Sequence, residues 1–419
     1  MSQATDSYQC AAARYEDEGF DPPFDANQPG NSSMTNRPAV RAGRRGWKIV
    51  VMRCLAMALA WSAMSAMAAT PAAGYRIVGY VVDASPLPPV NAQKLDVINY
   101  AFAKLDPESN VVFPSPVADK TLAAFVALRK VNPNLKVIVS IGGWGADYFS
   151  EAALTDASRQ HMADSVVALV ERHDVDGVDL DWEYPTLPGP GISHRPEDRR
   201  HFSLLLETLR ARLDQFGAKH GGRHYLLTIA AADSEFVAGI ELERASRSLD
   251  WFNLMTYDFH QSLTPTTGHH AGLHLSALAP ADDRAGDKAV AQFLAAGVPA
   301  KKLNLGVAFY GRAFTGVDPA HDGLQQKYAK YVGAPSWREL VASYIDKNGY
   351  VRHWDAQAQA PYLWNAATRT FVSYEDPESL RAKAAFVKAK GLGGVMYWEQ
   401  SLDRNEALLD VLDQSLRMH

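Results

Sequence analysis

The sequence predicts an α/β fold, a closed (β/α)8 TIM barrel with a small α+β insertion between its seventh and eighth strands. Three observations lead to this prediction. After Gly74, short runs rich in β-branched residues recur eight times, helix-period segments separate most of them, and the region exceeds the ~250 residues that such a barrel needs. A doubly wound open sheet is the alternative, but no GxGxxG turn follows the first strand.

Composition and charge exclude several other classes of protein. The chain has 419 residues, of which 47% are apolar and 21% charged, so it can bury a large core and is neither wholly disordered nor collagen-like. Its formal charge of -5 argues against nucleic acid as a partner. Both cysteines, Cys10 and Cys54, precede residue 70, so the domain that follows contains no disulfide, thiolate metal site or cysteine nucleophile.

The first part of the chain has the features of a targeting region. Residues 1–36 are polar and show no apolar periodicity, and the charges between residues 37 and 53 are all positive. An apolar stretch over residues 54–68 ends in Ala-Met-Ala, the small-x-small pattern that signal peptidase cleaves. A basic flank, a short apolar run and a small-residue site together indicate a secretory signal.

We therefore expect residues 52–68 to be a signal peptide and the protein to be secreted, either extracellular or periplasmic, meeting a membrane only transiently. Residues 1–51 are then a disordered N-terminal extension or sequence upstream of the true start. A membrane anchor is the alternative, because the apolar stretch counted from Ile49 reaches about 20 residues, enough to span a bilayer.

The predicted strands alternate with helices through the rest of the chain. The strands lie at residues 75–82, 97–102, 136–140, 177–182, 225–230, 252–257, 303–308 and 394–398. Residues 118–130 and 199–216 show helical periodicity, with apolar side chains along one face of the second segment. A last helix is expected near residues 376–390.

One interval is too long for a single crossover helix, since about 80 residues separate the seventh strand from the eighth. Residues 316–373 hold several Trp and Tyr residues among turn residues, and we interpret them as a small α+β insertion domain. Barrel strands 1–7 are then expected within residues 75–315, and strand 8 with a terminal helix within residues 374–419. We expect no appended binding module after the barrel.

The most informative stretch is the acidic segment 176–185, which reads Asp-Gly-Val-Asp-Leu-Asp-Trp-Glu-Tyr-Pro. Strand side chains alternate, so Asp179, Asp181 and Glu183 share one face, and Pro185 ends the strand at the mouth where barrel active sites lie. Like charges crowded together raise the pKa of one group until it holds a proton near neutral pH. This is the requirement for a general acid.

Two alternative roles fit these carboxylates less well. A solvated acidic face would need polar residues on the opposite side of the strand, where Leu180 and Trp182 stand. A calcium loop would need irregular backbone and a glycine at its sharp turn, whereas this segment has the pattern of a strand. We therefore predict a site without a metal ion or a cofactor.

The acidic segment resembles the DxxDxDxE signature of the glycoside hydrolase family 18 chitinases. Ser-Ile-Gly-Gly-Trp at 140–144 resembles the SxGG motif of that family, Met-Thr-Tyr-Asp at 255–258 the MxYD motif, and residues 391–398 the end of its eighth strand. The resemblance covers roughly residues 75–419. It implies a hydrolase that cleaves β-1,4 bonds between N-acetylglucosamine units, with chitin or chitooligosaccharide as its partner. We expect a monomer, because nothing in the sequence requires more.

The resemblance also implies roles for the catalytic residues. Glu183 would protonate the glycosidic oxygen and later serve as the base for water, while the substrate's own N-acetyl oxygen attacks the anomeric carbon with retention. Asp181 would orient the acetamide N–H and share a proton with Asp179. Tyr257 would donate its hydroxyl to the acetamide oxygen.

Further positions are assigned by the same resemblance. Asp258 matches a sugar-contacting carboxylate and Trp398 the aromatic floor under the reacting sugar. The remaining residues are expected to line the cleft (Met255, Tyr310, Arg312, Trp144) or to hydrogen-bond Asp179 from behind (Tyr80, Ser140). Ordinary core packing is the alternative role for the aromatic residues among them.

The chain departs from the family pattern in its aromatic residues. Residues 260–263 read His-Gln-Ser-Leu where relatives often have His-Gly-Ser-Trp, which would weaken sugar stacking by ~1 kcal/mol and argues against processive attack on crystalline chitin. An endo-β-N-acetylglucosaminidase or a peptidoglycan hydrolase of the same family, or a non-catalytic chitin-binding lectin, are the alternatives. Endo and exo action both stay open.

Overall fold

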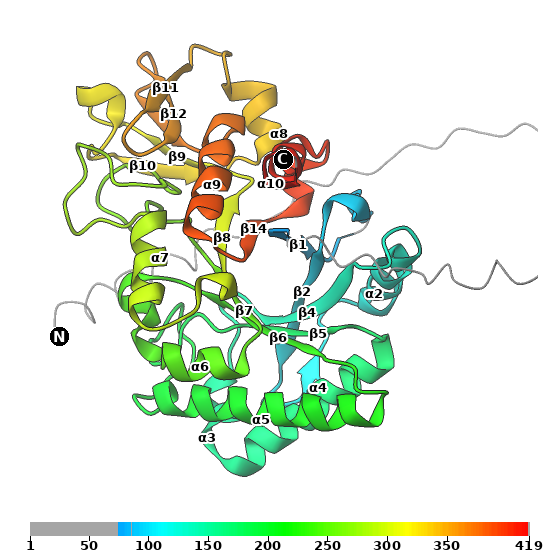
Figure 1. Ribbon diagram of the computed structural model, residues 1–419. Helices are drawn as coiled ribbons and strands as arrows, with labels where there is room; N and C mark the ends of the chain where they lie inside the picture. The colour runs from blue at the N-terminus through cyan, green and yellow to red at the C-terminus, as the bar shows by residue number, and fades with distance from the viewer. Residues whose placement is uncertain (1–73, 85, 418–419) are drawn as a thin grey trace, which may run out of the picture. The chain divides into compact units, whose positions relative to one another are not determined.

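The computed structural model describes residues 74–84 and 86–417, in which eight parallel strands close into a barrel (Figure 1). The barrel strands are β1 (Arg76–Val82), β2 (Val97–Leu105), β4 (Lys136–Gly142), β5 (Gly177–Asp181), β6 (Leu226–Ala231), β7 (Trp251–Leu254), β8 (Leu303–Ala308) and β14 (Gly394–Trp398). Each pairs with the next, and β14 pairs with β1 to close the ring. The predicted (β/α)8 barrel is confirmed.

Helices follow most of the strands and cover the outside of the barrel. They are α2 (Ala118–Ala127), α3 (Phe149–Leu154), α4 (Asp156–His173), α5 (Asp198–Lys219), α6 (Leu242–Ser248), α7 (Gly286–Ala295), α9 (Pro377–Lys390) and α10 (Ala407–Arg417). The apolar face predicted for residues 199–216 is buried in α5. α9 begins where the Asp376 side chain accepts hydrogen bonds from the backbone of Glu378 and Ser379, a capping arrangement that fixes its first turn.

The sixth barrel strand, β7, is shorter than predicted. β7 ends at Leu254, and the Thr256 hydroxyl donates to the carbonyl of Gly306 at 2.7 Å, which turns the chain out of the sheet. Asp258 then adopts a left-handed conformation with φ of 57°. Residues 255–257, predicted as the end of a strand, therefore form a loop with Asp258 at the carboxyl mouth of the barrel.

The insertion between β8 and β14 forms a second sheet. Its antiparallel strands, in the order β10-β9-β13-β12-β11, are β10 (Lys330–Gly333), β9 (Arg312–Thr315), β13 (Thr370–Ser373), β12 (Ala360–Asn365) and β11 (Val351–Asp355). The short helix α8 (Trp337–Glu339) precedes β11. The sheet begins at Arg312 rather than at the expected residue 316, because Arg312–Thr315 pair with Thr370–Ser373 and not with a barrel strand.

A two-residue strand, β3 (Val111–Val112), pairs antiparallel with β2 outside the ring. No helix within residues 74–84 and 86–417 has the length and apolar character needed to cross a bilayer. The expected signal peptide (52–68) and N-terminal extension (1–51) lie outside the described residues.

Candidate active site

Strand β5 places its carboxylates as the alternation predicts. Asp179 and Asp181 point into the barrel and are buried, whereas Trp182 points outward. The indole of Trp182 stacks on Phe149 of α3, with centroids 5.4 Å apart, and meets Phe202 of α5 edge-on. Because an apolar side chain anchors the outer face, the carboxylates cannot turn away from the barrel interior.

Asp179 accepts hydrogen bonds from four side chains on four different strands. Its Oδ2 accepts from the hydroxyls of Tyr80 at 2.7 Å and Ser140 at 2.8 Å. Its Oδ1 accepts from the hydroxyl of Thr228 at 2.5 Å and the amide of Asn253 at 3.2 Å. Burial raises the pKa of Asp179, and these hydrogen bonds oppose the rise.

Asp181 lies next to this network without joining it. Its Oδ1 is buried and has no hydrogen-bond partner in the described part of the chain, and no hydrogen bond joins it to Asp179 there. Burial, and then the charges of Glu183 and Asp179, raise the pKa of Asp181 well above its usual value. Asp181, which lacks such donors in the described residues, therefore favours its protonated form more strongly than Asp179 does.

The neighbouring strand approaches Asp181 closely at Gly142. A Cβ atom at Gly142, whose φ is 125°, would lie 2.1 Å from the carbonyl oxygen of Asp181. The next amide, that of Gly143, donates to the same oxygen at 2.9 Å. The two glycines of the SxGG motif thus allow the backbone of β4 to hold Asp181 in place.

Glu183 lies two residues beyond the end of β5, at the mouth of the barrel, and is partly exposed. Burial raises the pKa of Glu183 to about 7, and the charge of Asp258 adds to the rise. A hydrogen bond from the Tyr184 side chain and the charge of Lys104 act in the opposite direction. A carboxyl group with this pKa holds a proton at neutral pH and can release it, as a general acid and base must.

Lys104 brings a positive charge to these carboxylates. It follows Phe102 on β2, and its Nζ donates to the carbonyl of Gly142 at 2.6 Å while lying 5.3 Å from the Phe102 ring. Within residues 74–84 and 86–417 its ammonium makes no ion pair, and it acts on both Asp181 and Glu183. A cation held by a neutral carbonyl keeps its charge available to neighbouring carboxylates.

Tyr257 is buried beside the acidic group. Its hydroxyl lies 3.7 Å from the sulfur of Met396. Burial raises the pKa of Tyr257 well above its usual value, and the charges of Asp181, Asp258 and Glu183 raise it further. The phenol therefore stays protonated at every working pH and is available as a hydrogen-bond donor.

A second polar group joins the barrel to the insertion sheet. Arg312 of β9 donates to Asp258 through Nε at 2.8 Å and Nη2 at 2.6 Å, and His270 lies 3.7 Å from the same carboxylate. Burial would raise the pKa of Asp258, but the charge of Arg312 holds it below its usual range. Tyr310 packs under the guanidinium at 5.1 Å and meets Tyr257 edge-on, so the two groups adjoin.

Aromatic residues border the site on two sides. Trp398, at the end of β14, stacks on Phe102 with centroids 5.6 Å apart and tilts against Tyr80. Met255 packs into the same cluster of side chains as Trp398. Trp144, after β4, has 41% of its surface exposed and meets Tyr184 edge-on at 6.4 Å.

The residues of the site that sequence reasoning missed include Thr228, Asn253, Lys104, Tyr184 and His270. Thr228 and Asn253 occupy inward positions of predicted strands. A polar residue within an apolar strand usually has a buried hydrogen-bond partner, and this was the signal that could have identified them. Lys104 and Tyr184 carried no such signal, because their relation to the carboxylates depends on how neighbouring strand ends meet. No group of three or more metal-ligating side chains occurs in the part of the chain that the structure describes.

Comparisons with known proteins agree on one family. The family model for glycosyl hydrolases family 18 matches residues 76–403. The chain is 40% identical to chitinase A1 of Niallia circulans over 350 residues, which cover 78% of this chain and 50% of that protein. It is 30% identical to chitinase B of Serratia marcescens over 400 residues, which cover 79% and 78%. The chain thus spans about half the length of chitinase A1.

A solved structure is equally similar. The family 18 N-acetylglucosaminidase from Paenibacillus barengoltzii superposes with a TM-score of 0.77 at 42% identity, over 82% of this chain and 100% of that one. These matches confirm the resemblance that the four motifs predict.

Proposed function

The chain belongs to family 18 of the glycosyl hydrolases, and from this premise we propose that it is a secreted chitinase. It hydrolyses β-1,4 bonds between N-acetylglucosamine units by a retaining, substrate-assisted mechanism. The observation that carries the proposal is Glu183, a carboxyl group at the barrel mouth whose pKa of about 7 suits acid and base catalysis. The names of the relatives support chitin as the substrate.

The arrangement of the carboxylates supports substrate assistance. A two-carboxylate retaining mechanism needs a second carboxylate as nucleophile. Asp179 is saturated by hydrogen bonds, and both oxygens of Asp258 accept from Arg312. The raised pKa of Asp181 favours its protonated form, which is a poor nucleophile. The acetamide oxygen of the substrate is therefore the group that attacks the anomeric carbon.

In the first step Glu183 gives its proton to the glycosidic oxygen, and the bond from that oxygen to the anomeric carbon breaks. The acetamide oxygen bonds to the same carbon from the other side, so an oxazolinium ion forms. Asp181 holds the acetamide N–H while Tyr257 donates to the acetamide oxygen. Glu183, now ionised, takes a proton from water while the water oxygen bonds to the anomeric carbon. The bond from that carbon to the acetamide oxygen breaks, which restores the acetamide and gives net retention.

The test is the hydrolysis of N-acetylglucosamine tetramers to hexamers by the full chain beside Glu183→Gln. We expect cleavage with the β-anomer as the first product, observed by NMR, and a loss of at least ~10³-fold in kcat for the variant. An α-anomer as first product would exclude the proposed mechanism. Binding of oligomers without cleavage by the parent protein would establish the lectin alternative.

An N-acetylglucosaminidase is the second candidate, because the solved structure of that name is 42% identical and is covered completely by this chain. The same experiment separates the two functions through product length. A chitinase releases dimers or longer products from a hexamer, whereas an N-acetylglucosaminidase releases monomers from the first turnover. Failure to cleave any of the oligomers would direct attention to glycoprotein glycans and peptidoglycan.

Secretion rests on the sequence of residues 52–68. We expect expression of the full gene to yield a mature protein outside the cytoplasm whose N-terminal sequence begins at residue 69. Recovery of the intact N-terminus in the membrane fraction would favour the anchor instead.

A further inference from the structure

Two asparagines lie inside the barrel where apolar side chains usually fill the core. Asn253 of β7 and Asn304 of β8 face each other in register on neighbouring strands, and both are fully buried. A buried amide destabilises the fold unless its hydrogen bonds are made, so their presence calls for a physical reason.

The two amides form a series of hydrogen bonds that ends at Asp179. The Nδ2 of Asn304 donates to the Oδ1 of Asn253 at 3.0 Å. The Nδ2 of Asn253 donates to the Oδ1 of Asp179 at 3.2 Å. Since the oxygen of Asn253 accepts from Asn304, its nitrogen faces Asp179 and also donates to the Tyr80 hydroxyl at 3.4 Å.

It matters which atom of Asn253 faces Asp179, because the other hydrogen-bond partners of Asp179 are not restricted to donating. The hydroxyls of Tyr80, Ser140 and Thr228 can each donate or accept a hydrogen bond, so they fit either an ionised or a protonated carboxyl group. An amide nitrogen only donates. Asn253 is therefore the partner that distinguishes the two forms of Asp179, and it favours the ionised form.

We propose that Asn304 and Asn253 form a donor relay that keeps Asp179 ionised, so that the proton of the aspartate pair stays on Asp181. Asn304 is a positioning residue, since it acts by fixing the orientation of the Asn253 amide. If Asn304 is removed, Asn253 can turn its oxygen toward Asp179, and that arrangement requires a protonated Asp179. The inference rests on the proposed function in so far as Asp181 takes part in the reaction.

The surroundings of Asp179 and Asp181 agree with a proton on Asp181. The titratable groups that face Asp179 are Tyr80 from β1, Asp181 from its own strand and Tyr257 from the loop after β7. Burial raises the pKa of both aspartates, and hydrogen bonds oppose the rise for Asp179. Asp181 has no such donors in the described residues, since Lys104 acts on it through charge alone.

The experiment compares the full-length protein with Asn304→Leu, which has a similar shape but no donor. Carboxyl ¹³C NMR follows the titration of Asp179, whose signal is assigned by its loss in Asp179→Asn. We expect the midpoint for Asp179 to rise by about one pH unit in Asn304→Leu and the pH profile of kcat to change with it. In the Asn253→Leu background, Asn304→Leu should have no further effect, because the relay is already interrupted.

Asn99→Leu is the matched control. Asn99 is also fully buried inside the barrel, on β2, and neither its Nδ2 nor its Oδ1 has a partner in the described residues, so its removal should leave the Asp179 midpoint unchanged. Equal shifts in both variants, an unchanged midpoint in Asn304→Leu, or additive effects with Asn253→Leu would each overturn the relay. If Asn304→Leu does not fold, Asn304→Ala gives the same comparison with a smaller side chain. The NMR titration needs no turnover, so a failed relay and a failed function are distinguishable.

Discussion

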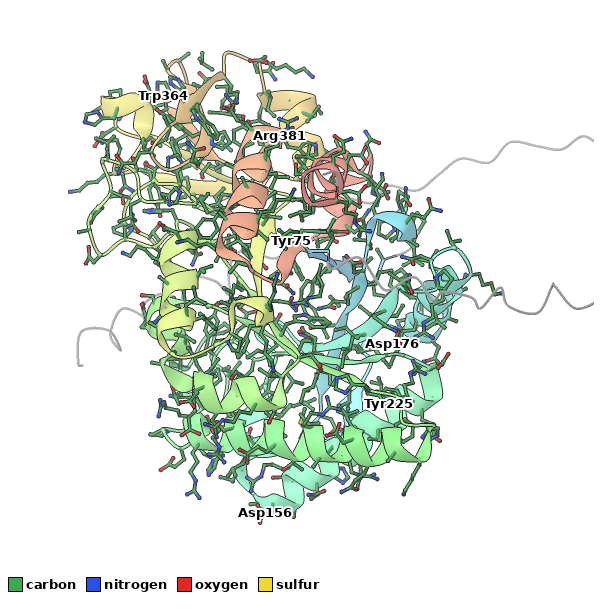
Figure 2. All side chains as sticks on the ribbon, in the orientation of Figure 1. Tyr75, Asp156, Asp176, Tyr225, Trp364 and Arg381 are labelled. Carbon is green, nitrogen blue, oxygen red and sulfur yellow. The ribbon has the colours of Figure 1, made fainter. Side chains whose placement is uncertain are left out.

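The two ends of β5 carry the same kind of side chain in opposite surroundings. At the amino end lies Asp176, which is labelled in Figure 2. It accepts from Arg129 at 2.6 Å and from Arg223 at 2.8 Å, with Lys136 at 3.8 Å. At the carboxyl end, Asp181 and Glu183 make no ion pair among the described residues and lie close to each other. The carboxylate at the amino end is neutralised by cations, whereas the acidic groups at the carboxyl end lie together without ion pairs among the described residues.

This contrast separates stability from chemistry along a single strand. Paired carboxylates at the amino end stabilise the barrel, as is usual for the face opposite the active site. At the mouth, burial raises the pKa of Asp181 and of Glu183, and the charge of Glu183 adds to the rise for Asp181, which destabilises the fold and creates an acid near neutral pH. Asp176 belongs to the same motif as Glu183, so the motif itself does not distinguish the two functions.

The largest effect is expected at the carboxyl end. Asp181→Asn should lower kcat by ~10²–10³-fold, because an amide, unlike the carboxyl group of Asp181, cannot ionise to balance the charge of the oxazolinium ion. The free energy of unfolding should not fall, since a neutral amide replaces a buried acid whose ionised form is unfavourable. Kinetics and urea unfolding measure both quantities. A variant that loses stability and keeps its kcat would reverse the assignment of the two ends.

The amino end should respond in the opposite way. Asp176→Asn is expected to lower the free energy of unfolding by about 2 kcal/mol, because it removes a buried carboxylate that pairs with the partly exposed Arg129 and Arg223, while the folded fraction keeps its kcat. Asp174→Asn is the matched control: Asp174 pairs with the same two arginines, but 65% of its side chain is exposed. Its loss should cost less than about 1 kcal/mol. Similar losses in both variants would contradict the role given to burial.

Lys104→Met removes the cation whose charge lowers the pKa of the carboxylates at the barrel mouth. Its positive charge favours the ionised form of Glu183, so its removal should raise the pKa of Glu183 above about 7. Because the acid must be protonated to react, the alkaline limb of the kcat profile should move upward by roughly half to one pH unit. Lys136→Met removes a cation from the amino end and should leave that limb in place. A downward shift in Lys104→Met would refute the assignment.

The smallest effect is expected for Trp144→Ala. An exposed indole that stacks on a sugar contributes about 1 kcal/mol, so KM for a hexamer should rise roughly 5-fold with little change in kcat. Trp182→Ala removes an indole from the outer face of the same region and should lower stability instead. Equal KM values for the parent and Trp144→Ala would show that this tryptophan lies outside the binding region.

The sequence predicted most of what depends on local pattern. Alternation along β5 was sufficient to place Asp179 and Asp181 inside the barrel, and eight β-branched runs were sufficient for the fold. It could not predict that Arg312 belongs to the insertion sheet, since β9 pairs with a strand more than 50 residues away. Lys104 was missed for the same physical reason: its effect arises from strands that meet only in the folded protein.

The ion pair between Arg312 and Asp258 limits how the insertion can be removed or exchanged by protein engineering. Residues 316–373 look like a removable module, and excising them would leave the barrel strands intact. The cut would nevertheless deprive β9 of both of its neighbours, β10 and β13, and release the guanidinium that balances Asp258. Insertion domains from relatives can therefore be exchanged only together with the residue at position 312 and the loop that carries Asp258.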